Sequence, residues 1–154
     1  MKISFTLNGE NVNIGVSPNT LLLELLRSLG MTSVKRGCET GECGACTILV
    51  DGTPRPSCIT LAAQIDGRRV VTAEALSKRE SLSPLQQSFA DRGAAQCGYC
   101  TPAMLLLADE FLQREKSPGE SEVREALSGV LCRCTGYVKP VEAISAVAGG
   151  PDEE

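Results

Sequence analysis

The stretch GCETGECGAC at residues 37–46 decides how this chain folds. It holds three cysteines at C-x4-C-x2-C spacing, and a fourth follows after eleven intervening residues. This is the spacing of a plant-type [2Fe–2S] ligand loop. Thiolates so close in sequence converge on one cluster only from an irregular loop, because a helix or strand points them in different directions. The stretch therefore predicts a first metal site, with the ligands Cys38, Cys43, Cys46 and Cys58.

Three glycines, Gly37, Gly41 and Gly44, lie between and beside these cysteines. Glycine adopts positive φ at little cost and allows a close approach of the backbone. Its neighbours' N–H groups can then point at sulfur and offset the negative charge of a cluster. A mobile turn is the plain alternative, but the interleaving with cysteine favours a cluster-binding loop.

The chain has 154 residues, 42% of them hydrophobic, and a net charge of −4. It is long enough for one domain of average size or two small ones. The acidic balance argues against nucleic acid as a partner. We expect neither a Sec-type signal nor a membrane span, since the N-terminal apolar run is broken at Asn8-Gly9 and no later run is long enough. Eight cysteines without a signal indicate a reducing compartment, so a cytoplasmic location is expected.

Histidine is absent from the whole sequence. This excludes a Rieske centre, histidine-ligated haem, zinc held by two cysteines and two histidines, and histidine as a general acid or base. The sequence also lacks the G-x-x-x-x-G-K-[ST], G-x-G-x-x-G and G-x-S-x-G motifs. The chemistry of the chain is therefore expected to depend on sulfur, with no catalytic residue of its own.

The first half of the sequence predicts a small α+β domain with a mixed sheet. Strands are expected in four segments, at residues 3–7, 12–16, 47–50 and 68–72. Asn8-Gly9 is typical of a hairpin turn between the first two strands. Leucines at residues 21–29 share one helix face, and Gly30 ends that helix. We place this domain at residues 1–75.

From residue 76 onward the pattern predicts a four-helix domain, residues 76–154. The expected helices cover residues 84–93, 101–112, 117–129 and 140–148, the last ending before Gly149-Gly150. Ser83 and Gln86 form a capping box around Pro84 at the start of the first helix. The second helix is apolar around nearly its whole circumference, so it is either central in the bundle or covered by a partner.

The other four cysteines fall in two interhelical turns, Cys97 and Cys100 as C-x2-C, and Cys132 and Cys134 as C-x-C. If the helices pair antiparallel, both turns meet at one end of the bundle. Four thiolates there could hold a structural zinc ion or a second [2Fe–2S] cluster. The spacing alone leaves both open and favours iron–sulfur.

With QCGYCTP at residues 96–102 and LCRCTGY at residues 131–137, the chain resembles the small iron–sulfur subunit of the molybdenum hydroxylases, the family of xanthine dehydrogenase, aldehyde oxidoreductase and carbon monoxide dehydrogenase. The resemblance covers residues 3–148. It implies a ferredoxin-like (β-grasp) domain and a four-helix domain with one [2Fe–2S] cluster each. All eight cysteines are then ligands, those of the second cluster being Cys97, Cys100, Cys132 and Cys134.

The resemblance also implies partner chains in a hetero-oligomer, for which a dimer of heterotrimers is one arrangement. A large subunit carries molybdopterin, usually as the cytosine dinucleotide in bacteria, and a medium subunit carries FAD. Electrons pass from molybdenum to the helical-domain cluster, then to the plant-type cluster, then to FAD and an external acceptor. Gln96 and Cys134 match positions that contact the pterin. Ala103 and Val130 depart from the family's usual glycine and asparagine, which puts in doubt a hydrogen bond from residue 130 but not the ligation.

The substrate site of this family lies on another chain, so purines, other N-heterocycles, aldehydes and carbon monoxide remain open. Residues 32–35 and the QCGYC form favour a purine or N-heterocycle. Two other function classes compete with this interpretation. A free ferredoxin-like carrier needs only the first four cysteines, and a zinc-stapled interaction module is colourless where an iron–sulfur protein is red-brown.

Overall fold

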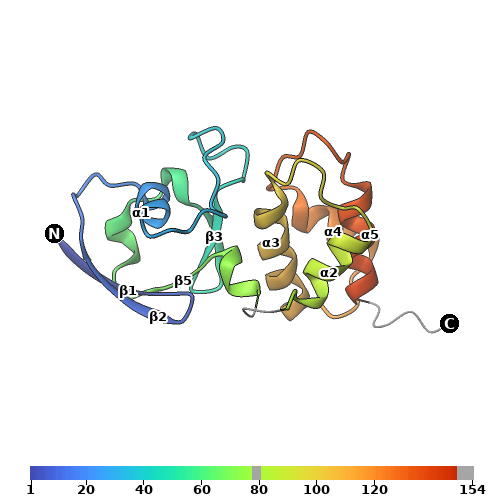
Figure 1. Ribbon diagram of the computed structural model, residues 1–154, viewed down its shortest axis with the longest axis horizontal. Helices are drawn as coiled ribbons and strands as arrows, with labels where there is room; N and C mark the ends of the chain where they lie inside the picture. The colour runs from blue at the N-terminus through green and yellow to red at the C-terminus, as the bar shows by residue number, and fades with distance from the viewer. Residues whose placement is uncertain (78–80, 149–154) are drawn as a thin grey trace.

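The N-terminal half of the computed structural model, which describes residues 1–77 and 81–148, is built on a five-stranded sheet (Figure 1). The strand order is β2-β1-β5-β3-β4. The strands are β1 (Lys2–Leu7), β2 (Glu10–Gly15), β3 (Thr47–Val50), β4 (Thr53–Pro56) and β5 (Arg69–Val71). β1 and β5 are parallel and the other neighbours antiparallel, which confirms the mixed sheet.

The first hairpin and the helix behind it follow the predicted pattern. Asn8 and Gly9 have φ of 51° and 90°, the left-handed values that a tight two-residue hairpin turn requires. Ile3, Phe5 and Leu7 alternate onto the inner face of β1 and are buried. The leucines of α1 (Leu22–Ser28) pack against them in the same core. The alternation of the strand and the helical spacing of the leucines thus build one interface.

The return from β3 differs from the predicted pattern. Residues 53–56 form the strand β4, although two of its four residues are proline. Because β4 is an edge strand, its prolines remove no hydrogen bond from the centre of the sheet. In the described residues, short 3-10 helices at Ser57–Ile59 and Ala62–Ile65 connect β4 to β5, and another at Ala73–Leu76 follows β5. Segments this short do not show the hydrophobic periodicity from which a helix is predicted.

The C-terminal half contains the four predicted helices. They are α2 (Pro84–Asp91), α3 (Thr101–Arg114), α4 (Glu120–Leu127) and α5 (Val138–Ala148). At the start of α2, Ser83 Oγ accepts from Gln86 N at 3.2 Å, and Gln86 Oε1 accepts from Ser83 N at 2.8 Å. The capping box is therefore confirmed. The predicted end of the last helix at Gly149-Gly150 lies outside the described residues.

Helix α3 is central in the helical domain. Its apolar circumference had left open whether it is central or covered by a partner. All residues from Ala103 to Ala108 are buried. One side of α3 packs against β3 and the segment Ala73–Leu76, and the others against α2, α4 and α5. The chain itself thus covers this helix on several sides (Figure 1).

The buried side chains form two separate cores. One lies between the sheet and α1, and the other lies among α2 to α5. The chain passes from the first core to the second after β5, and Leu76 already packs against the second core. The division into residues 1–75 and 76–154 stays a prediction. Within residues 1–77 and 81–148, no helix is long and apolar enough to cross a membrane.

Candidate iron–sulfur sites

The cysteine-bearing segments lie along one edge of the molecule. The loop of residues 37–46, the turn before α3 and the turn before α5 all lie at the upper edge in Figure 1. The two interhelical turns therefore meet at one end of the helical domain, as their sequence positions predict.

The loop of residues 37–46, called here the cluster loop, directs backbone N–H groups at the Cys38 sulfur. Thr40 N, Glu42 N and Cys43 N lie 3.4, 3.3 and 3.3 Å from Cys38 Sγ. The Thr40 hydroxyl, followed by these N–H groups, lowers the pKa of Cys38 to about 5. The loop thus favours an anionic sulfur before any metal is considered, as backbone nests do for anions.

Glycine is required beside these thiols for two reasons. Gly41 and Gly44 have φ of 85° and 69°, which side chains disfavour. Gly37 does not have positive φ, but a Cβ there would lie 2.6 Å from Cys43 Sγ. The prediction of positive φ thus holds for two of the three glycines. The third is needed for close approach, since Cys38 N also donates to Cys43 Sγ at 3.4 Å.

The other two thiols of this set are buried beneath the loop. Cys46 is 2% and Cys58 3% exposed. Burial, the adjacent Cys46 thiol and the nearby Cys38 together raise the pKa of Cys58 to about 11. A neutral thiol is therefore favoured at Cys58 in the absence of a cation. A bound iron ion would supply the positive charge that a second buried thiolate needs.

In the helical domain, the four thiols contact one another as two pairs. Cys100 is buried, and its pKa is raised to about 12 by burial and by its contact with Cys132. Cys97 and Cys134 are exposed and hydrogen-bond to each other. The Tyr99 N–H and this bond lower the pKa of Cys97, and the same bond raises that of Cys134. One pair therefore lies inside the domain and the other at its surface.

Two further residues shape the turn before α5 and were not singled out from the sequence. The Thr135 hydroxyl lies 3.1 Å from Cys132 Sγ, and although burial acts to raise the pKa of Cys132, Thr135 lowers it overall. The Tyr137 hydroxyl accepts from Cys132 N and donates to Val130 O, each at 2.9 Å. The roles of these two residues could have been predicted from the TGY sequence after the C-x-C pair, because hydroxyl side chains commonly hydrogen-bond to nearby backbone.

The paired arrangement fits a binuclear cluster. Each iron of a [2Fe–2S] cluster takes two protein ligands, and the four thiols of the helical domain lie as two pairs. A structural zinc ion instead needs four donors around one point. Four thiols in each domain provide the number of donors that a two-iron cluster needs.

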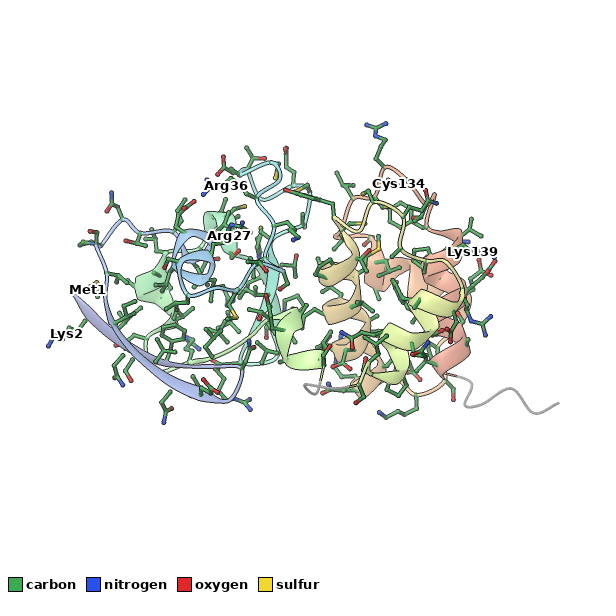
Figure 2. All side chains as sticks on the ribbon, in the orientation of Figure 1. Met1, Lys2, Arg27, Arg36, Cys134 and Lys139 are labelled. Carbon is green, nitrogen blue, oxygen red and sulfur yellow. The ribbon has the colours of Figure 1, made fainter. Side chains whose placement is uncertain are left out.

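The two residues expected to contact a pterin lie on the same surface. Gln96 is exposed and precedes Cys97, whose thiol contacts Cys134. Figure 2 shows Cys134 on the loop before α5, at the outer edge of the helical domain. Both side chains are thus accessible to a group held by another chain.

This fold and these thiols define an iron–sulfur protein with two binding domains. Residues 5–77 match the 2Fe-2S iron-sulfur cluster binding domain, and residues 72–145 match the [2Fe-2S] binding domain. The small FeS subunit of nicotinate dehydrogenase from Eubacterium barkeri is 49% identical, over 89% of this chain and 88% of that protein. The xanthine dehydrogenase iron-sulfur-binding subunit of Escherichia coli O157:H7 is 46% identical, over 92% and 91%.

A solved structure agrees with these relatives. Quinoline 2-oxidoreductase from Pseudomonas putida 86 superimposes with a TM-score of 0.92 and 48% identity, over 96% of this chain and 92% of that chain. The chain belongs to the family of small [2Fe–2S] iron–sulfur subunits of the molybdenum hydroxylases. Members of this family are electron-transfer subunits of oxidoreductases. The predicted family, α+β fold class and oxidoreductase role are confirmed.

Proposed function

We propose that this chain carries electrons from a molybdopterin centre on a large partner subunit to FAD on a medium partner subunit. A bound [2Fe–2S] cluster accepts and releases one electron at a time. The proposed ligands are Cys38, Cys43, Cys46 and Cys58 in residues 1–75, and Cys97, Cys100, Cys132 and Cys134 in residues 76–154. The observation that carries the proposal is the gathering of all eight thiols into two sets of four, one in each domain.

The chain's own residues act on these sites in three ways. Thiolates hold the irons, N–H groups such as those around Cys38 offset negative charge, and burial at Cys58 and Cys100 limits access of water. The helical-domain site is proposed to lie nearest the pterin, because Gln96 and Cys134 are exposed there. The exposed side of the cluster loop is then left for the flavin subunit.

For the complex as a whole, we propose an N-heterocyclic substrate. This is supported by relatives named for nicotinate, xanthine and quinoline, all nitrogen heterocycles, at 46–49% identity. A molybdopterin cytosine dinucleotide, a dimer of heterotrimers and a cytoplasmic location complete the proposal. The last is supported by the eight free thiols, which a reducing compartment preserves. Turnover of nicotinate, xanthine and benzaldehyde by the assembled complex would test the substrate class.

The decisive experiment for the electron-transfer role is metal analysis of the assembled complex. We expect about four irons and four acid-labile sulfides per chain of this subunit, with two EPR signals after dithionite reduction. Two irons with one signal would indicate a ferredoxin-like carrier with an empty helical domain. One zinc with no visible colour would indicate the interaction module. Either result would overturn the proposal.

A further inference from the structure

The cluster loop touches the helical domain at a point where Gly44 has no room for a side chain. A Cβ built on Gly44 would lie 1.9 Å from Gly129 O and 2.9 Å from Val130 Cα. Real Cβ atoms essentially never approach other atoms within 3.0 Å, so a methyl group would push the two segments apart by about 1 Å. Beside this contact, Leu131 N donates to Cys43 O at 2.9 Å. The two domains are therefore in direct backbone contact here.

A tyrosine side chain makes a second connection between the same two regions. The Tyr99 hydroxyl donates to Arg36 O in the segment that enters the cluster loop. Tyr99 stands between Cys97 and Cys100, and its own N–H points at the Cys97 sulfur. One residue thus contacts a thiol of the helical domain and the backbone just before the cluster loop.

The tyrosine is attached to a backbone position that is held in place. The Arg36 guanidinium forms ion pairs with Glu24 on α1 and with Glu39 in the loop. The N–H of the preceding residue, Lys35, donates to Ala45 O at 3.2 Å, near the other end of the cluster loop. Figure 2 places Arg36 at the same edge of the molecule as Cys134. The backbone that accepts the hydrogen bond from Tyr99 is therefore itself held in place by these contacts.

Both connections join segments that carry the proposed ligands. Gly44 follows Cys43 directly, Gly129 lies three residues before Cys132, and Tyr99 lies between two more ligands. These contacts therefore act directly on the spacing of the two thiol sets. Electron tunnelling slows steeply with distance, so the same contacts bear on the transfer between clusters.

We infer that Gly44 and Tyr99 are positioning residues that fix the distance between the two clusters by fastening the cluster loop to residues 129–131 and to the turn before α3. The inference rests on the proposed ligation of a cluster in each domain. It goes further, because two clusters could also be bound by domains joined only by their connecting segment.

The test uses the assembled complex, fully reduced with dithionite, and measures the magnetic interaction between the two reduced clusters by low-temperature EPR. Because dipolar coupling falls with the cube of distance, Gly44→Ala is expected to reduce the splitting, while iron content stays at the wild-type value. Gly93→Ala is the matched control: Gly93 has φ of 64°, close to that of Gly44, but a Cβ there meets nothing within 4 Å. Its splitting should equal that of the wild type.

Tyr99→Phe supplies a milder variant that keeps the ring and removes only the hydroxyl. We expect a broadened or smaller splitting with both cluster signals present. If Gly44→Ala keeps both clusters and the wild-type splitting, the inference is wrong. If Gly44→Ala loses the plant-type cluster, its splitting cannot be measured, and the test then depends on Tyr99→Phe. An unchanged splitting in Tyr99→Phe would overturn the inference. Fewer than four irons in the wild type would instead overturn the proposed function, so the two failures are distinguishable.

Discussion

Residues 37–46 place three thiols on one loop, whereas the helical domain takes two thiols from the turn before α3 and two from the turn before α5. In the cluster loop, N–H groups two to five residues further along the sequence surround the Cys38 sulfur. In the helical domain, Cys97 meets Cys134 and Cys100 meets Cys132 across more than thirty residues of chain. The first site is assembled mostly by local backbone conformation, and the second by packing of helices.

This difference has a consequence for how each site fails. A locally built loop depends on its own backbone conformation more than on distant packing. A site built from two separate turns depends on every helix that brings the turns together. The buried Phe89 on α2 and Ile144 on α5 are part of that support, although neither is near a thiol in sequence.

Replacing one ligand at each site is expected to have the largest effect. Serine is a poorer iron ligand than a soft thiolate, so Cys43→Ser and Cys100→Ser should each lower the iron content from about four to about two per chain. After mixing with nicotinate or xanthine, whichever the complex oxidises, Cys100→Ser should leave the plant-type cluster and flavin oxidised. Cys43→Ser should still reduce the helical-domain cluster, with slow reduction of flavin. Rapid-freeze EPR reads each centre.

The order of transfer is the part of this prediction most easily refuted. If the Cys43 variant reduced flavin at the wild-type rate, the plant-type cluster would not lie on the path. Cys100→Ser is then the internal control, because both variants lose one ligand of the same kind.

Core substitutions should separate the two sites by their dependence on packing. Phe89→Ala should cost about 3–5 kcal/mol and Ile48→Ala about 2–5 kcal/mol, because both side chains are fully buried. We expect Phe89→Ala to lose most of the helical-domain EPR signal. Ile48→Ala should keep more of the plant-type signal, since three ligands there share one loop. Equal loss of the two signals would contradict the proposed difference between the sites.

The capping box of α2 offers a smaller and more local perturbation. Ser83→Ala removes the acceptor for Gln86 N, and the expected loss of stability is about 1 kcal/mol. Urea unfolding followed by helical circular dichroism would measure it. Ser121→Ala, on the exposed first turn of α4, is the matched control and should stay within about 0.5 kcal/mol of the wild type. A Ser83 variant as stable as this control would show that the cap contributes nothing.

The smallest expected effect concerns Glu74 in the segment after β5. Burial acts to raise its pKa, but hydrogen bonds from Ser33 and Thr72 outweigh burial and lower it below the ordinary 4.5. A lowered pKa stabilises the folded state above pH 4.5, and this contribution is lost as the pH falls through the folded-state value. Because the carboxylate is only half-buried, the contribution should stay below about 1 kcal/mol.

Glu74→Gln measures this contribution without interference from other acid-sensitive groups. The difference in unfolding free energy between wild type and variant should be largest near pH 7 and shrink toward pH 4. A difference that is constant over this range would mean that the charge of Glu74 is not what stabilises the segment.

The elements with strong local patterns were predictable from the sequence. Alternation in β1, the leucine face of α1 and the Ser83 capping box depend on residues a few positions apart. The C-x4-C-x2-C spacing likewise indicated a cluster loop, and the cysteine positions put the other thiols in two turns. The short strand β4 and the 3-10 helices were missed because their residues carry no period and their form is set by neighbours.

By itself, the sequence determined which residues could act as ligands, because ligand chemistry depends on side-chain type and spacing. Only the tertiary structure decided which thiols pair, that α3 is covered by its own chain, and that Gly44 meets Gly129. The same holds for the Tyr99 hydroxyl, whose acceptor lies 63 residues away. Such contacts arise between segments that share no local pattern, so packing of the whole chain, and not the preference of any one segment, selects them.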